Sequence, residues 1–219
     1  EINAEFIERD AAQINSKWVG ESEQNVARLF NDCRNKFLNL GSKRPIIIFI
    51  DEVDALFGEK KGGCDYGVEM RNQFLKEMDS LGEKNCNLPL YVIASTNKPW
   101  SLDFAFVRRF QKRVHVAMPN KTMREEMMKL FTNEMKLDPS IDFSYLSEIC
   151  NGYSGSDLKN VCMDAYQSTI DRVFESDIKP ELDPVSERDF VGAIERRSPS
   201  VSNEVISQIK DWARANKAN

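Results

Sequence analysis

The chain has 219 residues, of which 41% are hydrophobic and 30% are charged. This composition is typical of a globular protein with one large domain or two small ones. The net charge of −5 gives no global basic field that would favour nucleic acid or an acidic membrane, although local basic patches stay open. A single histidine excludes a metal site built on histidines. The five cysteines form no CxxC pair and indicate reduced thiols, hence an intracellular, cytoplasmic location.

Strands and helices are expected to alternate along the first half of the chain. Helical spacing of apolar residues predicts helices over residues 21–37 and 70–78, and apolar runs between them predict buried strands. The expected strands cover residues 5–8, 46–50, 90–94 and 113–117. This alternation predicts an α/β fold in which a parallel sheet is layered with helices.

The second half of the chain has a helical pattern throughout. Apolar residues at helical spacing define stripes that we interpret as core, and Ser186 and Ser202 are in position to cap helices. The stripes are Met123, Met127, Leu130 and Phe131, then Leu158, Val161, Cys162 and Ala165, then Phe190 and Ile194. We therefore expect a large α/β subdomain over residues 1–117, a small all-helical subdomain over 118–199 and a C-terminal helix over 200–219.

Two adjacent carboxylates, Asp51 and Glu52, end the apolar run over residues 46–50. The carboxyl ends of parallel strands are where open α/β sheets bind their ligands. In a nucleotide hydrolase, Asp51 could hold Mg²⁺ through its water shell and Glu52 could orient or deprotonate the attacking water. The alternative is that Asp51 merely caps the helix that follows the strand.

Asn97 follows the strand expected over residues 90–94. If the two buried strands are neighbours, Asn97 lies beside Glu52, where its amide could hold the attacking water or a γ-phosphate oxygen. The alternative is an Asn that forms a turn before Lys98-Pro99. The pairing of the two strand ends favours the functional interpretation.

Arg108 and Arg109 stand side by side between apolar residues. A guanidinium that reaches the nucleotide of a neighbouring subunit would stabilise charge on the γ-phosphate. A solvated basic face is the ordinary alternative, so the residues alone leave this role open.

Five segments in order resemble the motifs of an AAA+ ATPase of the classical AAA type. Residues 51–56 resemble the Walker B box, Thr96-Asn97 sensor 1, and Arg108-Arg109-Phe110 the arginine-finger box. Residues 152–158 resemble the sensor 2 segment, and residues 16–23 resemble pore loop 1 with the start of its helix. The order and span of these motifs, which cover nearly the whole chain, make the resemblance specific.

The resemblance implies a homo-hexameric ring that binds ATP and Mg²⁺ between subunits. Arg108 and Arg109 would serve the neighbour's site, and Gly155 and Ser156 would approach the adenine or ribose from the small subdomain. A further expected site is the pore loop, in which an exposed aromatic offers a large contact area to a threaded polypeptide. Its residues are Lys17, Trp18 and Val19, although Trp18 could instead be ordinary core.

Within the family, residues 97–100 and 110–114 look like the clade of Vps4, katanin, spastin and fidgetin. This similarity implies a protein translocase, of the ESCRT-III disassembly or microtubule-severing type, whose final helix packs back on the large subdomain. Its substrate would be a protein, with a possible membrane or microtubule association and no direct nucleic acid. Residues 167–187 look too short for the small β element of Vps4, and a membrane-protein extractase of the Msp1 type shares residues 155–159.

Two departures from the family pattern stand out. The sequence contains no GxxxxGK[ST] phosphate loop, and the family's first strand is expected to be missing with it. We therefore expect the chain to be a fragment of a longer one; a catalytically inactive interaction module is the alternative. Val68-Glu69 also stands where the family usually carries a basic pair.

Overall fold

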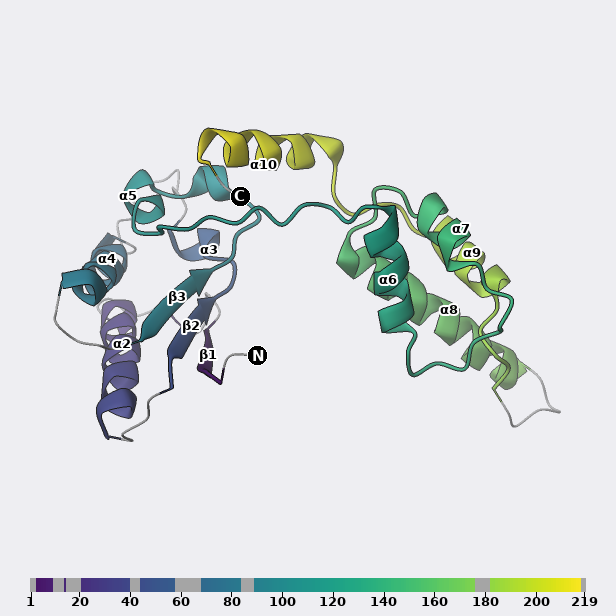
Figure 1. Cartoon of the computed structure of the whole chain (residues 1–219), viewed down its shortest axis with the longest axis horizontal. Helices are drawn as coiled ribbons and strands as arrows, with labels where there is room; N and C mark the ends of the chain where they lie inside the picture. The colour runs from purple at the N-terminus through teal and green to yellow at the C-terminus, as the bar shows by residue number, and fades with distance from the viewer. Residues whose placement is uncertain are drawn as a thin grey trace. The chain divides into compact units, whose positions relative to one another are not determined.

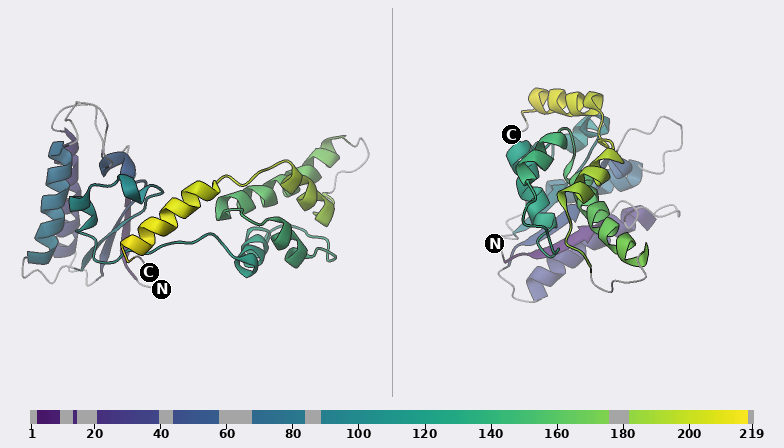
Figure 2. Two further views of the ribbon diagram at one scale, coloured as in Figure 1. Left: turned by 90° about the horizontal axis from the view of Figure 1, so that it is seen from above. Right: turned by 90° about the vertical axis from the view of Figure 1, so that its right-hand side faces the viewer.

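A computed structural model describes residues 3–9, 14, 21–39, 44–57, 68–83, 89–175 and 182–217. Contacts between residues divide the chain into two compact units, which Figures 1 and 2 show. Unit 1 comprises Glu1–Val114 together with Asp211–Asn219, and unit 2 comprises His115–Lys210. None of the described helices is long and apolar enough to cross a membrane.

Unit 1 is built on a parallel sheet of three described strands in the order β1 (Glu5–Arg9), β2 (Ile46–Ile50) and β3 (Leu90–Ala94). The register aligns Arg9 with Ile50 and Ile50 with Ala94, so the three strands end level with one another. The predicted parallel sheet is therefore confirmed for these strands.

Helices cover one face of this sheet. Helices α2 (Glu21–Asn39) and α4 (Val68–Glu83) pack against each other and lie on the same side of the strands (Figure 1). Three short helical segments complete the unit, namely α3 (Asp54–Phe57), η1 (Pro99–Ser101) and α5 (Phe104–Val107). The core between sheet and helices includes the fully buried side chains of Val26, Phe30, Ile48, Phe57, Phe74 and Phe106.

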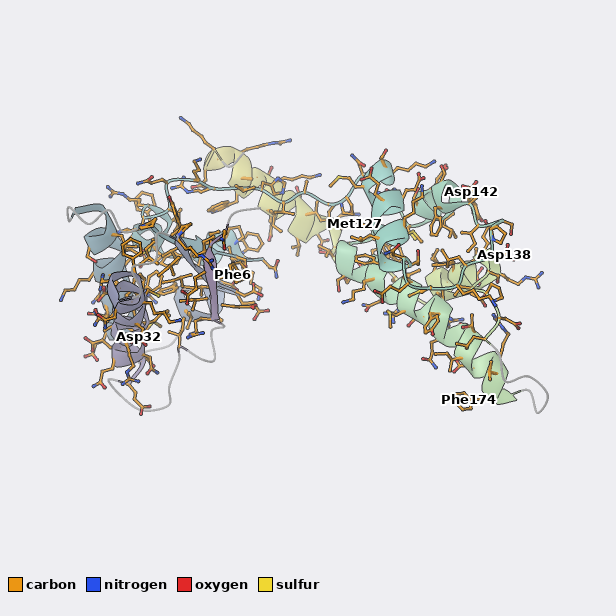
Figure 3. The ribbon with its side chains drawn as sticks, turned by 60° about the horizontal axis from the view of Figure 1, so that its bottom comes forward. Phe6, Asp32, Met127, Asp138, Asp142 and Phe174 are labelled. Atoms are coloured by element: carbon orange, nitrogen blue, oxygen red, sulfur yellow. The ribbon has the colours of Figure 1, made fainter. Side chains whose placement is uncertain are left out.

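The opposite face of the sheet is largely open in the described part of the chain. Phe6, Tyr91 and Ile93 are about half exposed there, and Phe6 stacks on Phe49 of the neighbouring strand. Figure 3 shows Phe6 on β1. The alternation of buried and exposed side chains along β3 therefore reflects a sheet covered by helices on one side only.

The prediction of a strand over residues 113–117 is wrong. This segment has no regular secondary structure, and Val114 and Val116 are exposed. A strand exists only through hydrogen bonds to a neighbour, and none of the described strands pairs with this segment. Instead Arg113 donates from its guanidinium to the carbonyl of Val107 and to the carbonyl of Asn216, both at 3.1 Å.

Unit 2 is helical, as predicted. Its helices are α6 (Lys121–Phe131), α7 (Phe143–Ile149), α8 (Gly155–Glu175), α9 (Glu187–Glu195) and the first part of α10 (Asn203–Ala215), which crosses into unit 1. Helix α6 packs on α7 and α8, and α8 packs on α9. The core comprises Met128, Leu146, Leu158, Val161, Cys162 and Phe190 among others.

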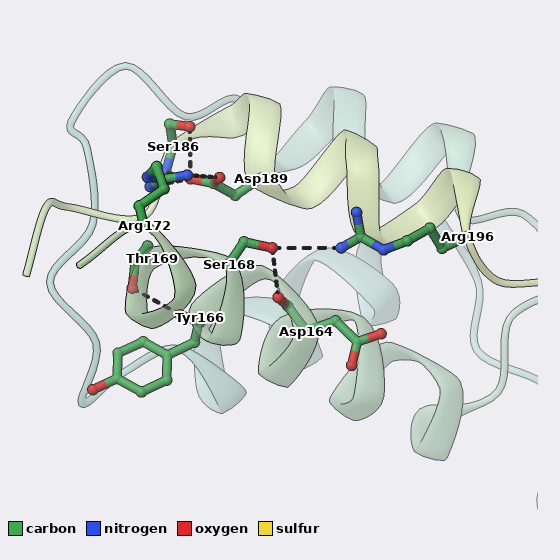
Figure 4. A network of polar contacts seen from close by, with 8 residues as sticks. All are labelled: Asp164, Tyr166, Ser168, Thr169, Arg172, Ser186, Asp189 and Arg196. Atoms are coloured by element: carbon green, nitrogen blue, oxygen red, sulfur yellow. Dashed lines mark hydrogen bonds and ion pairs between the residues drawn. The ribbon is translucent and has the colours of Figure 1, made fainter. Parts of the chain in front are cut away.

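Polar side chains cap three of the helices of unit 2. The side chain of Asn120 accepts a hydrogen bond from the backbone of Met123 at the start of α6, and Asp142 caps α7 in the same way. Figure 3 labels Asp142, which precedes α7, and Met127, which lies on α6. Helix α9 begins at Ser186, whose backbone N–H and hydroxyl both donate to Asp189, while the same carboxylate accepts two bonds from Arg172 of α8 (Figure 4).

Candidate functional site

The level strand ends bring Asp51 and Ser95 together at the carboxyl edge of the sheet. The backbone N–H of Asp51 donates to Arg9 at 3.3 Å, and the N–H of Ser95 donates to Ile50 at 3.0 Å. The N–H of Val53 then donates back to Ser95 at 3.0 Å. The turn that carries the two carboxylates is thus fixed to both neighbouring strands.

Asp51 presents an exposed carboxylate whose direction is set by its neighbours. Its Oδ1 atom accepts a hydrogen bond from the Ser95 hydroxyl and another, at 2.9 Å, from the N–H of Glu52. Neither donor belongs to α3, so the geometry does not support the alternative in which Asp51 is a helix cap. An oriented carboxylate open to solvent suits Mg²⁺, which binds few protein oxygens and keeps most of its waters.

Glu52 has a backbone φ of 49°, in the left-handed region. This conformation costs a residue with a side chain about 1–2 kcal/mol. The next residue, Val53, is buried in the core, and the carbonyl of Glu52 accepts the N–H of Ala55 at 2.9 Å. The result is a carboxylate turned out to solvent at the sheet edge, and strained backbone of this kind gathers at functional sites.

Asn97 lies on a turn that the Thr96 side chain stabilises. The Thr96 hydroxyl donates to Asp54 at 2.7 Å and accepts the N–H of Lys98 at 3.0 Å. The Asn97 side chain is exposed at the same edge as Asp51. The sequence motifs included Thr96 and Asp54 but did not predict that they support the site, and Ser95 was signalled only by the polar run directly after β3.

Arg108 and Arg109 follow α5 and have different surroundings. Arg109 forms a bidentate ion pair with Asp79 of α4, with distances of 3.0 and 2.9 Å. Hydrogen bonding from Arg109 lowers the pKa of the Asp79 carboxyl below its ordinary value. Arg108 is exposed, and its guanidinium carbon lies 5.7 Å from the centre of the Phe104 ring.

Gly155 and Ser156 open α8 in unit 2. A Cβ added to Gly155 would lie 2.9 Å from the terminal carbon of Met127, so the helix start packs closely on α6. Asp157, one residue further, accepts hydrogen bonds from the N–H and the hydroxyl of both Ser154 and Ser200. Burial alone would raise its pKa, but these bonds outweigh that effect and hold the pKa below its ordinary value. Ser156 itself is exposed.

The predicted pore-loop residues Lys17, Trp18 and Val19 lie outside the described residues. Of the remaining predicted site residues, the structure brings Asp51, Glu52 and Asn97 to one edge of the sheet.

Comparison with known protein families gives two matches. Residues 1–118 match the ATPase family associated with various cellular activities (AAA), and residues 140–183 match the AAA+ lid domain. The chain belongs to the AAA ATPase family. The family resemblance of the sequence is therefore confirmed, and the helices of unit 2 include the lid.

Individual relatives agree with this assignment. Cell division protein C of Sulfolobus acidocaldarius is 40% identical over 218 residues, which are 100% of this chain and 57% of that protein. Spastin of Xenopus laevis is 34% identical over 97% of this chain and 35% of its own length. The chain thus spans 57% of the length of the first of these relatives and 35% of the length of the second.

The solved AAA domain of FIGL-1 has the same fold. It superposes with a TM-score of 0.80 at 28% identity, over 95% of this chain and 67% of that domain. A second structure of the same domain, in complex with ADP, gives a TM-score of 0.78. The AAA architecture of this AAA ATPase therefore extends over nearly all of the sequence.

Proposed function

We propose that this AAA ATPase hydrolyses ATP and uses the energy to remodel a protein substrate. The observation that carries the proposal is the junction of β2 and β3, where the exposed carboxylates of Asp51 and Glu52 lie beside the turn of Asn97. Membership of the AAA family, together with similarity to spastin and katanin, supports ATP as the nucleotide.

Each group at this edge has a role in the proposed reaction. Asp51, oriented by the Ser95 hydroxyl, would hold the water shell of Mg²⁺, which when bound neutralises charge on the phosphates. Glu52 would accept a proton from the attacking water or orient it. Asn97, held in place through Thr96, would donate its amide to that water or to a γ-phosphate oxygen.

The proposed assembly is a homo-hexamer that binds nucleotide between subunits. Arg108 and Arg109 would lie at the interface that completes a neighbour's site, and Gly155 and Ser156 would face the adenine or ribose. Lys17, Trp18 and Val19 would contact a polypeptide in the central pore. Similarity to relatives of the spastin and katanin type supports this arrangement.

The catalytic assignment is tested by Glu52→Gln in the full-length protein. We expect binding of a fluorescent ATP analogue to persist and steady-state hydrolysis to fall by at least about 100-fold, because the amide cannot take the proton. Glu126→Gln, an exposed glutamate of α6, is the matched control and leaves both unchanged. Hydrolysis by Glu52→Gln at the wild-type rate would contradict the catalytic assignment of Glu52.

The substrate class that we propose is a protein assembly, with membrane-associated or microtubule-associated polymers as candidates. Relatives named as spastin, katanin and cell division protein C support this class. The Glu52→Gln protein should retain substrate in an ATP-dependent complex, which mass spectrometry would identify. If the full-length protein bound no ATP, an inactive interaction module would replace the proposed remodelling ATPase.

A further inference from the structure

Strand β1 lies at an edge of the sheet, because it pairs with β2 on one side and with no other strand in the described part of the chain. The backbone groups of Glu5 and Arg9 bond toward β2, at 2.8 and 3.3 Å. Backbone groups alternate in direction along a strand, so those of Phe6 and Glu8 point away from the sheet. An edge of this kind is a template on which another strand can form.

One of these outward groups already has a partner. The Nη1 atom of Arg9 donates to the carbonyl of Glu8 at 2.7 Å, in an exposed contact between adjacent residues. The described residues provide no hydrogen bond to the N–H of Glu8 or to either backbone group of Phe6. These backbone groups are therefore available for a further strand.

A groove of about 300 Å³ lies beside this edge and is lined by all of β1 and by part of α2. The residues from α2 are Leu29, Asp32, Cys33 and Lys36. Leu29 and Cys33 are buried, and burial raises the pKa of the Cys33 thiol, so this part of the groove is uncharged at neutral pH. The unpaired backbone of β1 thus has space for side chains next to it.

An unpaired carboxylate stands on each face of the edge. Glu8 shares the open face of the sheet with Phe6, because side chains alternate along a strand, whereas Asp32 belongs to α2 on the covered face. Figure 3 labels Phe6 on β1 and Asp32 on α2. Both carboxylates are exposed, and neither has a hydrogen bond or an ion pair within the described residues. Lys36 pairs instead with Glu5 at 2.6 Å.

We propose that the free edge of β1 is a docking site for an extended, basic segment of a partner protein, which adds a strand to the sheet. Main-chain bonds to Phe6 and Glu8 supply affinity, and the side chains of the added strand supply specificity. Neighbouring residues of a strand point to opposite faces, so two consecutive basic residues place one charge near Glu8 and the other near Asp32. The site uses none of the groups assigned to ATP hydrolysis, so it goes beyond the proposed function.

Synthetic peptides added to the full-length protein without nucleotide test this site. The probe is a fluorescent peptide of about eight residues, with valine and threonine on either side of a central pair of lysines. In the control peptide, two glutamates replace the lysines. We expect fluorescence anisotropy to show saturable binding of the lysine peptide and at least about tenfold weaker binding of the glutamate peptide. Equal binding of the two peptides, or no saturable binding of the lysine peptide, would overturn the proposal.

Charge reversal in the protein tests which residues select the peptide. We expect Glu8→Lys and Asp32→Lys each to weaken binding of the lysine peptide by at least about threefold, and the double variant to prefer the glutamate peptide. Reversal of the preference excludes general misfolding, because a misfolded edge would bind neither peptide. Glu126→Lys, at an exposed glutamate of α6, is the matched control and leaves both affinities unchanged. Unchanged affinities in the double variant would overturn the assignment of Glu8 and Asp32.

N-methylation of the lysine peptide at alternate residues distinguishes strand addition from a purely ionic contact. The methyl groups remove the N–H donors along one edge of an extended peptide, and the two possible patterns remove them from opposite edges. We expect one pattern to abolish binding and the other to change affinity by less than about twofold, because only one edge of the peptide faces β1. Equal affinities for the two patterns would overturn strand addition.

Analytical ultracentrifugation without nucleotide tests whether a second copy of the chain occupies the same edge. We expect the sedimentation of the double variant Glu8→Lys with Asp32→Lys to match that of the unmodified protein. Self-association that the double variant abolishes would assign the edge to a second copy and would overturn the proposed partner.

Discussion

Asp189→Ala should destabilise unit 2 by removing a contact that joins two helices and begins one of them. The Asp189 side chain is only 7% exposed, and it accepts bonds from the N–H and hydroxyl of Ser186 at 2.9 and 2.8 Å. It also accepts two bonds from Arg172 of α8 (Figure 4). The alanine variant therefore loses the start of α9 and its link to α8 together.

The loss of stability expected for Asp189→Ala follows from the contacts that are lost and from the exposure of Asp189 and Arg172. Loss of a helix-capping contact costs about 1 kcal/mol. The ion pair contributes about 1 kcal/mol more, a value reduced because Arg172 is 42% exposed and regains water when its partner is removed. A total of about 2 kcal/mol in a unit of this size corresponds to a fall in thermal midpoint of roughly 10 °C.

The pH dependence of this effect has a definite sign. Burial raises the pKa of Asp189, but hydrogen bonds from Arg172 and Ser186 outweigh burial, so the folded-state pKa lies below its ordinary value. The contribution of the ionised Asp189 carboxylate to the stability of unit 2 is therefore fully present above the unfolded-state pKa of about 3.9. This contribution is lost as pH falls through the lower folded-state pKa. The difference between wild type and Asp189→Ala should be constant from pH 6 to 7, and it should shrink below about pH 4.

The assay is thermal unfolding of the full-length protein by circular dichroism, with hydrogen exchange to localise the change to α8 and α9. Asp171→Ala is the matched control, because Asp171 is exposed on α8 and accepts one bond, from Gln167 at 2.9 Å. We expect the control to change stability by less than about 0.5 kcal/mol. A similarly small effect for Asp189→Ala at pH 7, or an effect at pH 3 as large as that at pH 7, would refute the reasoning.

Three further predictions concern packing and burial. Phe106→Ala should lower the free energy of unfolding of unit 1 by about 4 kcal/mol, because Phe106 is buried. Phe104→Ala, on the same helix at a 73% exposed side chain, should lower it by less than about 0.5 kcal/mol. Equal midpoints of the two variants in thermal melts would contradict this expectation. Gly152→Ala should lower the free energy of unfolding by about 1–2 kcal/mol, because the φ of 85° at this position is strained for a residue with a side chain. An unchanged midpoint in urea unfolding would contradict this expectation. Burial raises the pKa of the Cys150 thiol to about 11 and that of Cys162 to about 12, so the unfolded state ionises first. Stability of unit 2 should therefore fall as pH rises from about 9 to about 11, and alkylation of these thiols in the folded protein at pH 8 should be slow; rapid labelling located by peptide mapping would exclude the buried geometry.

The sequence alone determined most of the local structure. Apolar runs predicted β2 and β3, because strands buried in a parallel sheet are apolar along their length. Helical spacing predicted α2, α4, α6, α8 and α9 and the C-terminal helix α10, but not α7, and Ser186 marked the start of α9. The placement of Asp51, Glu52 and Asn97 at one edge also followed, because the ends of neighbouring parallel strands meet.

Contacts between residues distant in sequence were decided only by the tertiary structure. Residues 113–117 have a strand-like sequence but no described neighbouring strand to pair with. Arg109 and Asp79 are 30 residues apart, so only the packing of α5 on α4 distinguishes Arg109 from Arg108. The positive φ of Glu52, in the turn between β2 and α3, is likewise a feature of the folded chain that the sequence pattern did not predict. Periodicity reports which face of an element is buried, whereas the partner of each polar side chain depends on which elements meet, and that is fixed only in three dimensions.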